Sequence, residues 1–452
     1  MKLVLENIGM LEKAEVKLDG LTVIAGENDT GKSTVGKVLF CLIKAIGRYK
    51  EDLEESQEHH ITEKVEEILF QLRRYAIKYT ATSREEMEEI FSQSRREIRK
   101  NVTQGNAEKI YQRLDEFYKK TKRNRLFAET NERSLFDPVS NNARQQDIEK
   151  NLSDLDNLIK NPIQEKEAIQ NALKKVFQSE FSSQINSTNS QKSSIQLFDE
   201  DLVILDIELH KNKVALKNHH TDIFIQDATF IETPLILNLH DMLIRAKSGI
   251  EITQRRSAYL GVPYTTLHTK DLFDKLKERE NFSLDFNTDP ENSFRQNIRS
   301  IIDGEVVYSA EERDFVFVKD KQKIPIKNTA TGIKSFGILQ LLFDREFVAK
   351  RSYLILDEPE IHLHPKWQLQ YAELIAKLAK NNIPILVTSH SPYMIEALQR
   401  YSDKEGVKEK TNFYLAKQGI IEDKSSLGEI FEQLSEPFDT FDEMDKEILL
   451  DG

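Results

Sequence analysis

The most constraining feature of the sequence is a glycine-rich loop near its start. Residues 26–34 read Gly-Glu-Asn-Asp-Thr-Gly-Lys-Ser-Thr, which has the spacing of a phosphate loop. An apolar, β-rich run at 21–25 precedes the loop, and an apolar helical run at 35–46 follows it. Strand, loop and helix N-terminus in this order favour phosphate binding, because the helix dipole attracts anions. The sequence therefore predicts a nucleoside triphosphate site within an α/β fold.

The loop also predicts roles for its own residues. Lys32 is expected to reach the β- and γ-phosphates, and the Ser33 hydroxyl to hold Mg²⁺. The residues predicted to bind the nucleotide are Gly26, Asn28, Thr30, Gly31, Lys32, Ser33 and Thr34.

Two further apolar strands end in polar residues that suit the same site. The strand expected at 351–356 ends in Asp357, placed to reach Mg²⁺, and Glu358, placed to polarise an attacking water. The strand at 383–387 leads to His390, which we expect to face the γ-phosphate from the neighbouring strand. A lone histidine after a strand is more often structural, so both readings of His390 stay open.

Composition narrows the classes of protein. The formal net charge of −12 excludes nucleic-acid binding over the whole surface, so such contact needs a local basic patch. Cys41 is the only cysteine, which excludes intrachain disulfides and cysteine-based zinc sites. No apolar run reaches the roughly 18 residues of a membrane span, and the N-terminus lacks a signal-peptide pattern. We expect a cytoplasmic protein without membrane contact.

Changes of pattern along the chain predict its organisation. Short β-rich runs separated by turn residues predict a β-rich N-terminal lobe. From about residue 50 the sequence becomes charged with a helical period, which predicts an inserted helical arm. The domains expected are a discontinuous α/β head (1–49 and 190–425), a helical insertion (50–189) and an acidic C-terminal tail (426–452).

Between the halves of the predicted site, Thr331 and Gly332 stand at the expected start of an apolar helix. The backbone at such a position can bind a second anion. An ordinary capped helix gives the same pattern, so the pair alone is a weak signal.

In this order the motifs resemble the ABC-type ATPase heads of SMC, RecF and OLD (overcoming lysogenization defect) proteins. The string Asp357-Glu-Pro-Glu-Ile-His-Leu-His-Pro365 is similar to their Walker B and D-loop run. The fit is closer to small prokaryotic ATPases of anti-phage defence systems such as Septu or PARIS. The resemblance covers residues 1–45 and roughly 200–420, and it does not extend to the insertion.

The resemblance implies an ABC-type head with ATP and Mg²⁺ as cofactors and a composite active site. Two heads would dimerise around two ATP molecules, with Thr331-Gly332 of one head meeting the γ-phosphate bound by Lys32 of the other. Glu358 would be the catalytic base, His390 the γ-phosphate sensor and Gln226 the Q-loop residue. Asp29 replaces a common glycine of the family and puts a negative charge near the phosphates.

Three other clusters leave alternatives open. Glu360, His362 and His364 suit a metal site or, as the resemblance implies, a D-loop at a dimer interface. The basic run 119–125 suits nucleic-acid phosphates or a solvated helix face. The acidic, aromatic tail suits a basic partner or its own domain.

The resemblance implies two functions. In the first, a defence ATPase controls a separate nuclease or toxin. We expect a separate effector because the stretch after His390 is shorter than the nuclease domain that OLD proteins carry there. In the second, a RecF- or SMC-like ATPase acts on DNA in repair or chromosome maintenance. A transporter subunit is disfavoured because the Leu-Ser-Gly-Gly-Gln signature of that class is missing.

Overall fold

A computed structural model of the chain describes most of the sequence and divides it into two compact units. The described residues are 1–79, 92–93, 104–131, 138–161, 164–182, 184–187, 190, 192–211, 213–221, 223–248, 264–278, 289–423, 427–434 and 444. The first unit comprises Met1–Gly47 and Ile169–Gly452, and the second comprises Arg48–Ala168.

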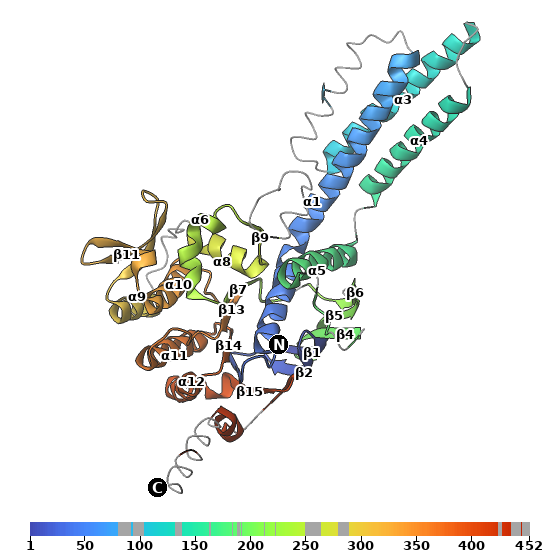
Figure 1. The fold of residues 1–452 in the computed structure, drawn as a ribbon. Helices are drawn as coiled ribbons and strands as arrows, with labels where there is room; N and C mark the ends of the chain where they lie inside the picture. The colour runs from blue at the N-terminus through green and yellow to red at the C-terminus, as the bar shows by residue number, and fades with distance from the viewer. Residues whose placement is uncertain are drawn as a thin grey trace. The chain divides into compact units, whose positions relative to one another are not determined.

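An eleven-stranded sheet runs through the first unit, as far as its residues are described (Figure 1). The strand order is β6-β5-β4-β1-β2-β16-β15-β3-β14-β13-β7. The strands are β1 (Lys2–Ile8), β2 (Leu11–Lys17), β3 (Leu21–Gly26), β4 (Lys192–Asp199), β5 (Leu202–His210), β6 (Lys213–His219), β7 (Asp227–Ile231), β13 (Ser352–Asp357), β14 (Ile385–Ser389), β15 (Thr411–Lys417) and β16 (Ile420–Asp423).

The sheet has two parts with different sequence patterns. Strands β6, β5, β4, β1 and β2 are antiparallel and alternate between buried and more exposed residues, as strands with one wet face do. Strands β15, β3, β14, β13 and β7 are parallel. β3, β13 and β14 are buried along their whole length, because helices cover both of their faces.

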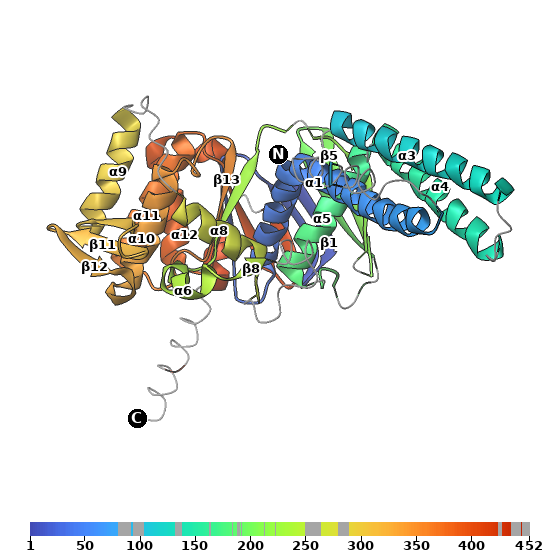
Figure 2. The same ribbon diagram turned by 90° about the horizontal axis from the view of Figure 1, so that it is seen from above.

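Helices cover the two faces of the parallel strands (Figures 1 and 2). On one side lie α10 (Thr331–Asp344), α11 (Pro365–Lys380) and α12 (Pro392–Glu405). Their core includes Leu354 and Leu356 of β13, whereas Ile355 points to the opposite face, where it meets Gly36 of α1 (Lys32–Tyr79). This alternation follows from the pleat of the strand.

The remaining elements complete the first unit. The helices are α5 (Glu165–Phe181), which crosses the unit boundary, α6 (His240–Leu243), α8 (Leu267–Lys277), α9 (Asp289–Ile302) and the 3₁₀ turns η1 (Pro234–Leu239), η2 (Ile326–Asn328) and η3 (Lys408–Lys410). A three-stranded sheet comprises β10 (Glu305–Ser309), β11 (Asp314–Lys319) and β12 (Gln322–Pro325), and a short parallel pair comprises β8 (Lys247–Ser248) and β9 (Tyr264–Thr265).

The second unit is helical in its described part. It contains the outer part of α1, α3 (Gln104–Asn131), α4 (Pro138–Lys160) and the start of α5. Apolar residues at helical spacing form its core, including Val65 and Ile68 of α1, Ile110 of α3, and Leu152 and Leu155 of α4. No helix in the described part of the chain is long and apolar enough to cross a membrane.

The boundaries of the units differ from the residue numbers expected for the insertion. The second unit ends at Ala168 rather than near 189. Most of α5 belongs to the first unit because its end is bonded there: the Gln170 side chain accepts from the N–H of Leu216, and the Ser179 carbonyl accepts from the Tyr264 hydroxyl at 2.9 Å.

The beginning of the expected acidic tail packs on its own unit. Residues 427–434 bring Ile430, which is fully buried, against Ala25 and Leu415. The Gln433 amide donates to the Glu27 carboxylate at 3.1 Å. For this stretch the structure favours folding against the chain's own domain, while 435–443 and 445–452 lie outside the described residues.

Candidate nucleotide site

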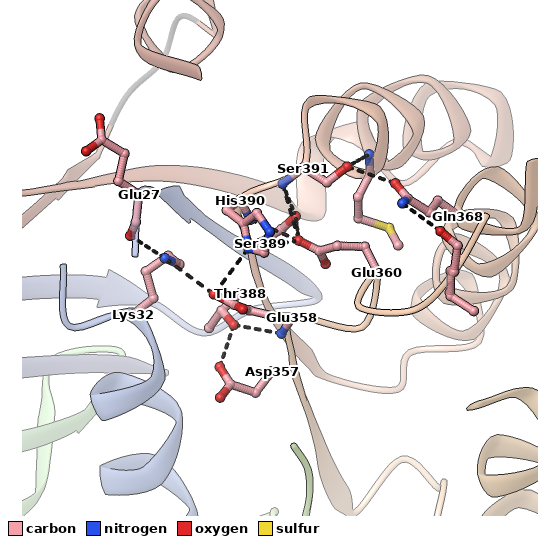
Figure 3. Close-up of polar contacts among 12 residues, drawn as sticks. Glu27, Lys32, Asp357, Glu358, Glu360, Gln368, Thr388, Ser389, His390 and Ser391 are labelled. Atoms are coloured by element: carbon pink, nitrogen blue, oxygen red, sulfur yellow. Dashed lines mark hydrogen bonds and ion pairs between the residues drawn. The ribbon is translucent and has the colours of Figure 1, made fainter. Parts of the chain in front are cut away.

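Parallel strands bring the predicted site residues to one edge of the sheet (Figure 3). Asp357 at the end of β13 pairs with Thr388 of β14, and Ser389 pairs with Ala25 of β3. The phosphate loop, Asp357 and His390 therefore follow neighbouring strand ends. Open parallel sheets bind their ligands outside this carboxyl edge.

The phosphate loop turns sharply between Gly26, the end of β3, and Lys32, the start of α1. Gly31 has a φ of 89°, which other residues rarely adopt, and a Cβ atom there would lie 2.5 Å from the Leu11 side chain. Asp29 also has a positive φ, 67°. Because the loop ends at a helix N-terminus, its backbone fits a bound phosphate.

The other loop residues predicted to bind the nucleotide lie on the same turn. The Thr30 hydroxyl donates to the Glu27 carbonyl at 2.9 Å, and the Thr34 N–H donates to the Gly31 carbonyl at 3.1 Å. The Asn28 side chain is exposed. Hydrogen bonds within the loop therefore hold its conformation, and the exposed Asn28 side chain is accessible to a ligand.

Lys32 is a buried cation at the centre of the site. Its ammonium donates to the Glu27 carbonyl at 2.5 Å and lies 3.7 Å from Oε1 of Glu358 (Figure 3). Burial lowers the pKa of Lys32, and the nearby Glu358 and Asp357 carboxylates only partly offset this effect. A phosphate group would supply the missing negative charge.

Asp357 offers a carboxylate to a metal ion beside the loop. It is buried and accepts from the Thr388 hydroxyl at 2.5 Å. Burial raises the pKa of Asp357, while hydrogen bonds from Thr388 and Ser33 act in the opposite direction. Mg²⁺ in nucleotide sites takes one or two protein oxygens and keeps several waters. The Ser33 hydroxyl and the Asp357 carboxylate, in contact with each other, fit this requirement.

Glu358 lies between two groups of the site. Its Oε1 is 3.7 Å from the Lys32 ammonium and 3.3 Å from Nδ1 of His390. Its φ of 48° is unusual for a residue with a long side chain, and its N–H is fixed by the carbonyl and hydroxyl of Thr388. The strained turn directs the carboxylate toward the loop, so the structure brings Lys32, Glu358 and His390 together.

Glu360 organises the segment that carries His390. Its Oε1 accepts from the Ser389 hydroxyl at 2.6 Å and from the N–H groups of His390 and Ser391 at 2.9 and 3.2 Å. Burial raises the pKa of this carboxyl group, and the hydrogen bonds oppose that rise. Sequence reasoning considered Glu360 as a metal ligand or interface residue and missed this positioning role.

A second missed residue, Glu232, lies next to Asp357. Ile231 at the end of β7 pairs with Leu356 of β13, so Glu232 and Asp357 follow in register. Neighbouring positions in register project to the same face of a sheet. Glu232 therefore belongs to the same edge, although its sequence context carries no motif.

Two cations hold the Glu232 carboxylate. Lys37 of α1 and Nε2 of His268 on α8 each lie 3.1 Å from one of its oxygens, and Nδ1 of His268 lies 2.6 Å from the buried Glu180 of α5. Chiefly through the hydrogen bond with His268, the pKa of Glu232 falls to about 2. Although burial opposes charge on His268, the two carboxylates raise its pKa to about 9.

Gln226 does not lie at the candidate nucleotide site. The prediction that it is the Q-loop residue is therefore wrong. It directly precedes β7, and its N–H donates to the Arg351 carbonyl just before β13. Because the strands are parallel, this is the amino edge of the sheet, whereas the phosphate loop follows a carboxyl end. The residue that follows β7 at the carboxyl edge is Glu232.

Thr331 and Gly332 open α10, as expected from the sequence. Among the residues that the structure describes, neither forms a hydrogen bond or ion pair with the phosphate loop of the same chain. The composite site that the resemblance implies places them on a second copy, and this placement stays a prediction.

Glu360, His362 and His364 have separate surroundings. Nδ1 of His364 accepts from the N–H of Lys366 at 3.2 Å and caps α11, whereas Glu360 binds the segment after β14. His362 is exposed with a φ of 66°. Within the described ranges no group of three or more His, Cys, Asp or Glu residues could hold a metal ion.

The basic run on α3 is partly neutralised. Lys119 pairs with Asp115 at 2.6 Å and Lys122 with Glu149 at 2.8 Å. The side chains of 124 and 125, and residues 95–100, lie outside the described part of the chain. These pairs are typical of a solvated helix face.

The fold and the site define an α/β P-loop ATPase, in agreement with the fold class predicted from the sequence. The model of a family described as AAA ATPase domain (AAA_15) matches residues 1–395. The chain belongs to this family of ATPase domains.

Similar proteins were found in two further comparisons. Protein MJECL11 of Methanocaldococcus jannaschii, described as uncharacterized, is 31% identical over 110 residues, which are 24% of this chain and 91% of that protein. The SMC head domain of Thermotoga maritima is 11% identical. That match covers 94% of this chain and 98% of the SMC chain, with a TM-score of 0.35. The Smc head domain of Pyrococcus furiosus, bound to the C-terminal domain of ScpA, is 12% identical. That match covers 96% of this chain and 98% of the Smc chain, with a TM-score of 0.38.

Proposed function

We propose that the protein hydrolyses ATP with Mg²⁺ at a site completed by a second copy of the chain. The observation that carries this proposal is the position of Glu358 between Lys32 and His390 at the carboxyl edge of the sheet. A carboxylate, a phosphate-binding cation and a γ-phosphate sensor in this arrangement suit hydrolysis of a terminal phosphate.

Each residue of the candidate site has its own role in the proposed reaction. Lys32 offsets the charge of the phosphates, and the loop N–H groups orient them. Glu358 accepts the proton of the attacking water, and His390, fixed through Glu360, faces the transferred phosphate. Bound at Ser33 and Asp357, Mg²⁺ would supply charge stabilisation of the phosphate oxygens.

The role of this hydrolysis is, in our proposal, to control a separate nuclease or toxin in prokaryotic anti-phage defence. Support comes from the resemblance of the phosphate loop and of the string from Asp357 to Pro365 to those of small defence ATPases. ATP would close a dimer of two heads and hydrolysis would reopen it, and the effector would respond to that change.

Purification of Glu358→Gln from its native host in the presence of ATP tests this role. The variant should bind ATP, hydrolyse it poorly and retain its partners. A nuclease or toxin recovered in stoichiometric amount supports control of an effector. Recovery of nucleic acid alone, with hydrolysis stimulated by DNA ends or gaps, would instead favour the RecF-like function.

A further inference from the structure

A short C-terminal segment, residues 427–434, packs beside the start of the phosphate loop. It is a turn followed by helix, and its apolar residues recur at helical spacing, which places them on one face. These residues are Leu427, Ile430, Phe431 and Leu434. Ile430 is fully buried, in a cluster with Ala25 of β3 and Leu415 of β15. The segment therefore has a defined place in the first unit.

The segment fixes the residues on both sides of Gly26. Ala25, before that glycine, belongs to the apolar cluster of Ile430. Glu27, after it, accepts a hydrogen bond at Oε1 from the side-chain amide of Gln433 at 3.1 Å. The first residues of the phosphate loop thus contact the C-terminal segment.

Glu27 connects this outer contact with the inside of the loop. Its carbonyl accepts from the Lys32 ammonium at 2.5 Å and from the Thr30 hydroxyl at 2.9 Å. Its side chain points away from Lys32 (Figure 3). One residue therefore joins the bond with Gln433 to two bonds that hold the conformation of the loop.

The conformation of the loop affects how tightly it binds a phosphate. The N–H groups of a phosphate loop bind an anion only when they point inward together. If a fraction of the molecules holds the loop in that conformation, the apparent affinity falls in proportion to the fraction. Contacts that fix the loop from outside should therefore raise its affinity for ATP.

We propose that the C-terminal segment positions the phosphate loop for ATP, with Ile430 and Gln433 as positioning residues. The inference rests on the proposed binding of ATP at this loop and extends the site to a segment outside the phosphate-loop motif. Both residues act through Ala25 and Glu27 and not by contact with the nucleotide. Because such coupling is reciprocal, bound ATP should in turn hold the segment in place.

Exchanging the partners of the bond between Gln433 and Glu27 tests the proposal. Gln433→Glu brings two carboxylates together, and their repulsion should separate the segment from the loop. The double variant Glu27→Gln with Gln433→Glu keeps the net charge and restores a bond with donor and acceptor exchanged. Glu27→Gln completes a double-mutant cycle, which isolates the bond from the effect of either charge alone.

Two further variants frame the cycle. Gln322→Glu adds the same charge at an exposed position of β12, which has no part in these contacts, and is the matched control. Ile430→Ala removes most of the buried side chain and loosens the whole segment.

Binding and turnover are measured separately on the full chain. A fluorescent Mg²⁺·ATP analogue gives the dissociation constant, steady-state phosphate release gives kcat and KM, and thermal unfolding checks the fold. Hydrogen–deuterium exchange of residues 427–434, with and without the analogue, gives the reciprocal effect.

We expect Gln433→Glu to weaken binding of the analogue and to raise KM at least about fivefold, with kcat close to that of the parent. The double variant should recover most of the affinity, and the control should match the parent. Ile430→Ala should change affinity in the same direction. The analogue should slow exchange in the segment of the parent protein.

Other results would overturn the inference. Gln433→Glu binding at the parent level, or a loss that the double variant does not recover, would exclude a role for the bond. Tighter binding by Ile430→Ala would show that the segment obstructs the loop. A parent protein that does not bind the analogue would instead contradict the proposed function, and with it this inference.

Discussion

Two charged clusters lie at opposite edges of the same parallel strands and differ in how completely their charges are paired. At the amino edge of β7, Lys44 and Lys275 each contact both Asp227 and Asp271 at distances between 2.5 and 3.1 Å. At the carboxyl edge, the distances from Glu358 to Lys32 and His390 are 3.7 and 3.3 Å.

This difference separates a structural cluster from a candidate active site. The amino-edge cluster has two cations and two carboxylates, and Lys275 also donates to the Ala228 carbonyl and the Thr229 hydroxyl. Both cations therefore lie within 3.1 Å of two carboxylates, although burial lowers the pKa of Lys275 as it does that of Lys32. At the carboxyl edge the Lys32 ammonium lies 3.7 Å from the Glu358 carboxylate, and this looser pairing leaves room for a charged ligand.

The largest expected effect is on catalysis at the carboxyl edge. Glu358→Gln should lower kcat by about 10²–10⁴-fold, because the glutamine cannot accept the proton of the attacking water. Steady-state phosphate release measures the effect. The thermal unfolding temperature should hardly change, and Glu373→Gln, which alters a half-buried carboxylate paired with Lys377 on α11, should leave both quantities unchanged. A Glu358→Gln enzyme that turns over at the normal rate would refute the role of Glu358 as the base.

The next effect is on stability at the amino edge. Asp271→Asn should lower the free energy of unfolding by about 3–5 kcal/mol, because it leaves Lys44 and Lys275 to share one carboxylate in a buried place. Urea denaturation measures the loss. The double variant Asp271→Leu with Lys275→Met keeps one balanced pair and should recover much of it. An Asp271→Asn protein as stable as the parent would show that this cluster is not a structural one.

His268 should contribute of the order of 3 kcal/mol to stability in a pH-dependent way. Its pKa is raised from 6.5 to about 9, so its contribution is complete below pH 6.5 and is lost as the pH rises through 9. The pKa of Glu232 is lowered to about 2, so its contribution is complete above pH 4.5 and is lost as the pH falls through 2.

Thermal unfolding of the parent protein and of His268→Gln between pH 5 and 10 checks this dependence. The difference in unfolding temperature should be largest near pH 5–6.5 and should shrink toward pH 9–10. Glu180, Glu232 and Lys37 are the charged groups around the ring that set this window. A difference that stays constant over this range would mean that His268 is not charged.

The smallest effect concerns Asp29 in the phosphate loop. Asp29→Asn keeps a residue that tolerates its φ of 67° and removes an exposed negative charge near the phosphates. ATP should bind about two- to fivefold more tightly at low ionic strength, and the gain should fade as salt screens the charge. Asp29→Gly removes the same charge and also relieves the backbone strain of a positive φ, so comparing it with Asp29→Asn separates the two effects. If only the glycine variant binds more tightly, strain rather than charge limits affinity.

The local motifs allowed the central part of the site to be predicted from the sequence. The phosphate loop, Asp357, Glu358 and His390 each follow an apolar strand, and parallel strands bring their carboxyl ends together. The sequence also allowed the helical core of the second unit to be predicted. Its apolar residues lie on one helical face, for example Ile61, Val65, Ile68 and Leu72.

The residues that were missed depend on strand register. Gln226 and Glu232 stand at the two ends of β7, and the sequence does not show which end adjoins the phosphate loop. The same holds for His268 and Glu180, which meet although 88 positions separate them. The roles of such residues depend on long-range packing, which the local pattern does not encode.

Mixing two inactive variants tests the central claim, that the ATPase site is shared by two copies, most directly. Lys32→Met removes the phosphate-binding cation of the phosphate loop, and Thr331→Glu places a negative charge at the α10 N-terminus. Each variant alone should hydrolyse almost no ATP. Random pairing gives half mixed dimers with one intact site each, so an equal mixture should regain about a quarter of the normal rate. Continued inactivity of the folded mixture, or full activity of Thr331→Glu alone, would contradict a shared site.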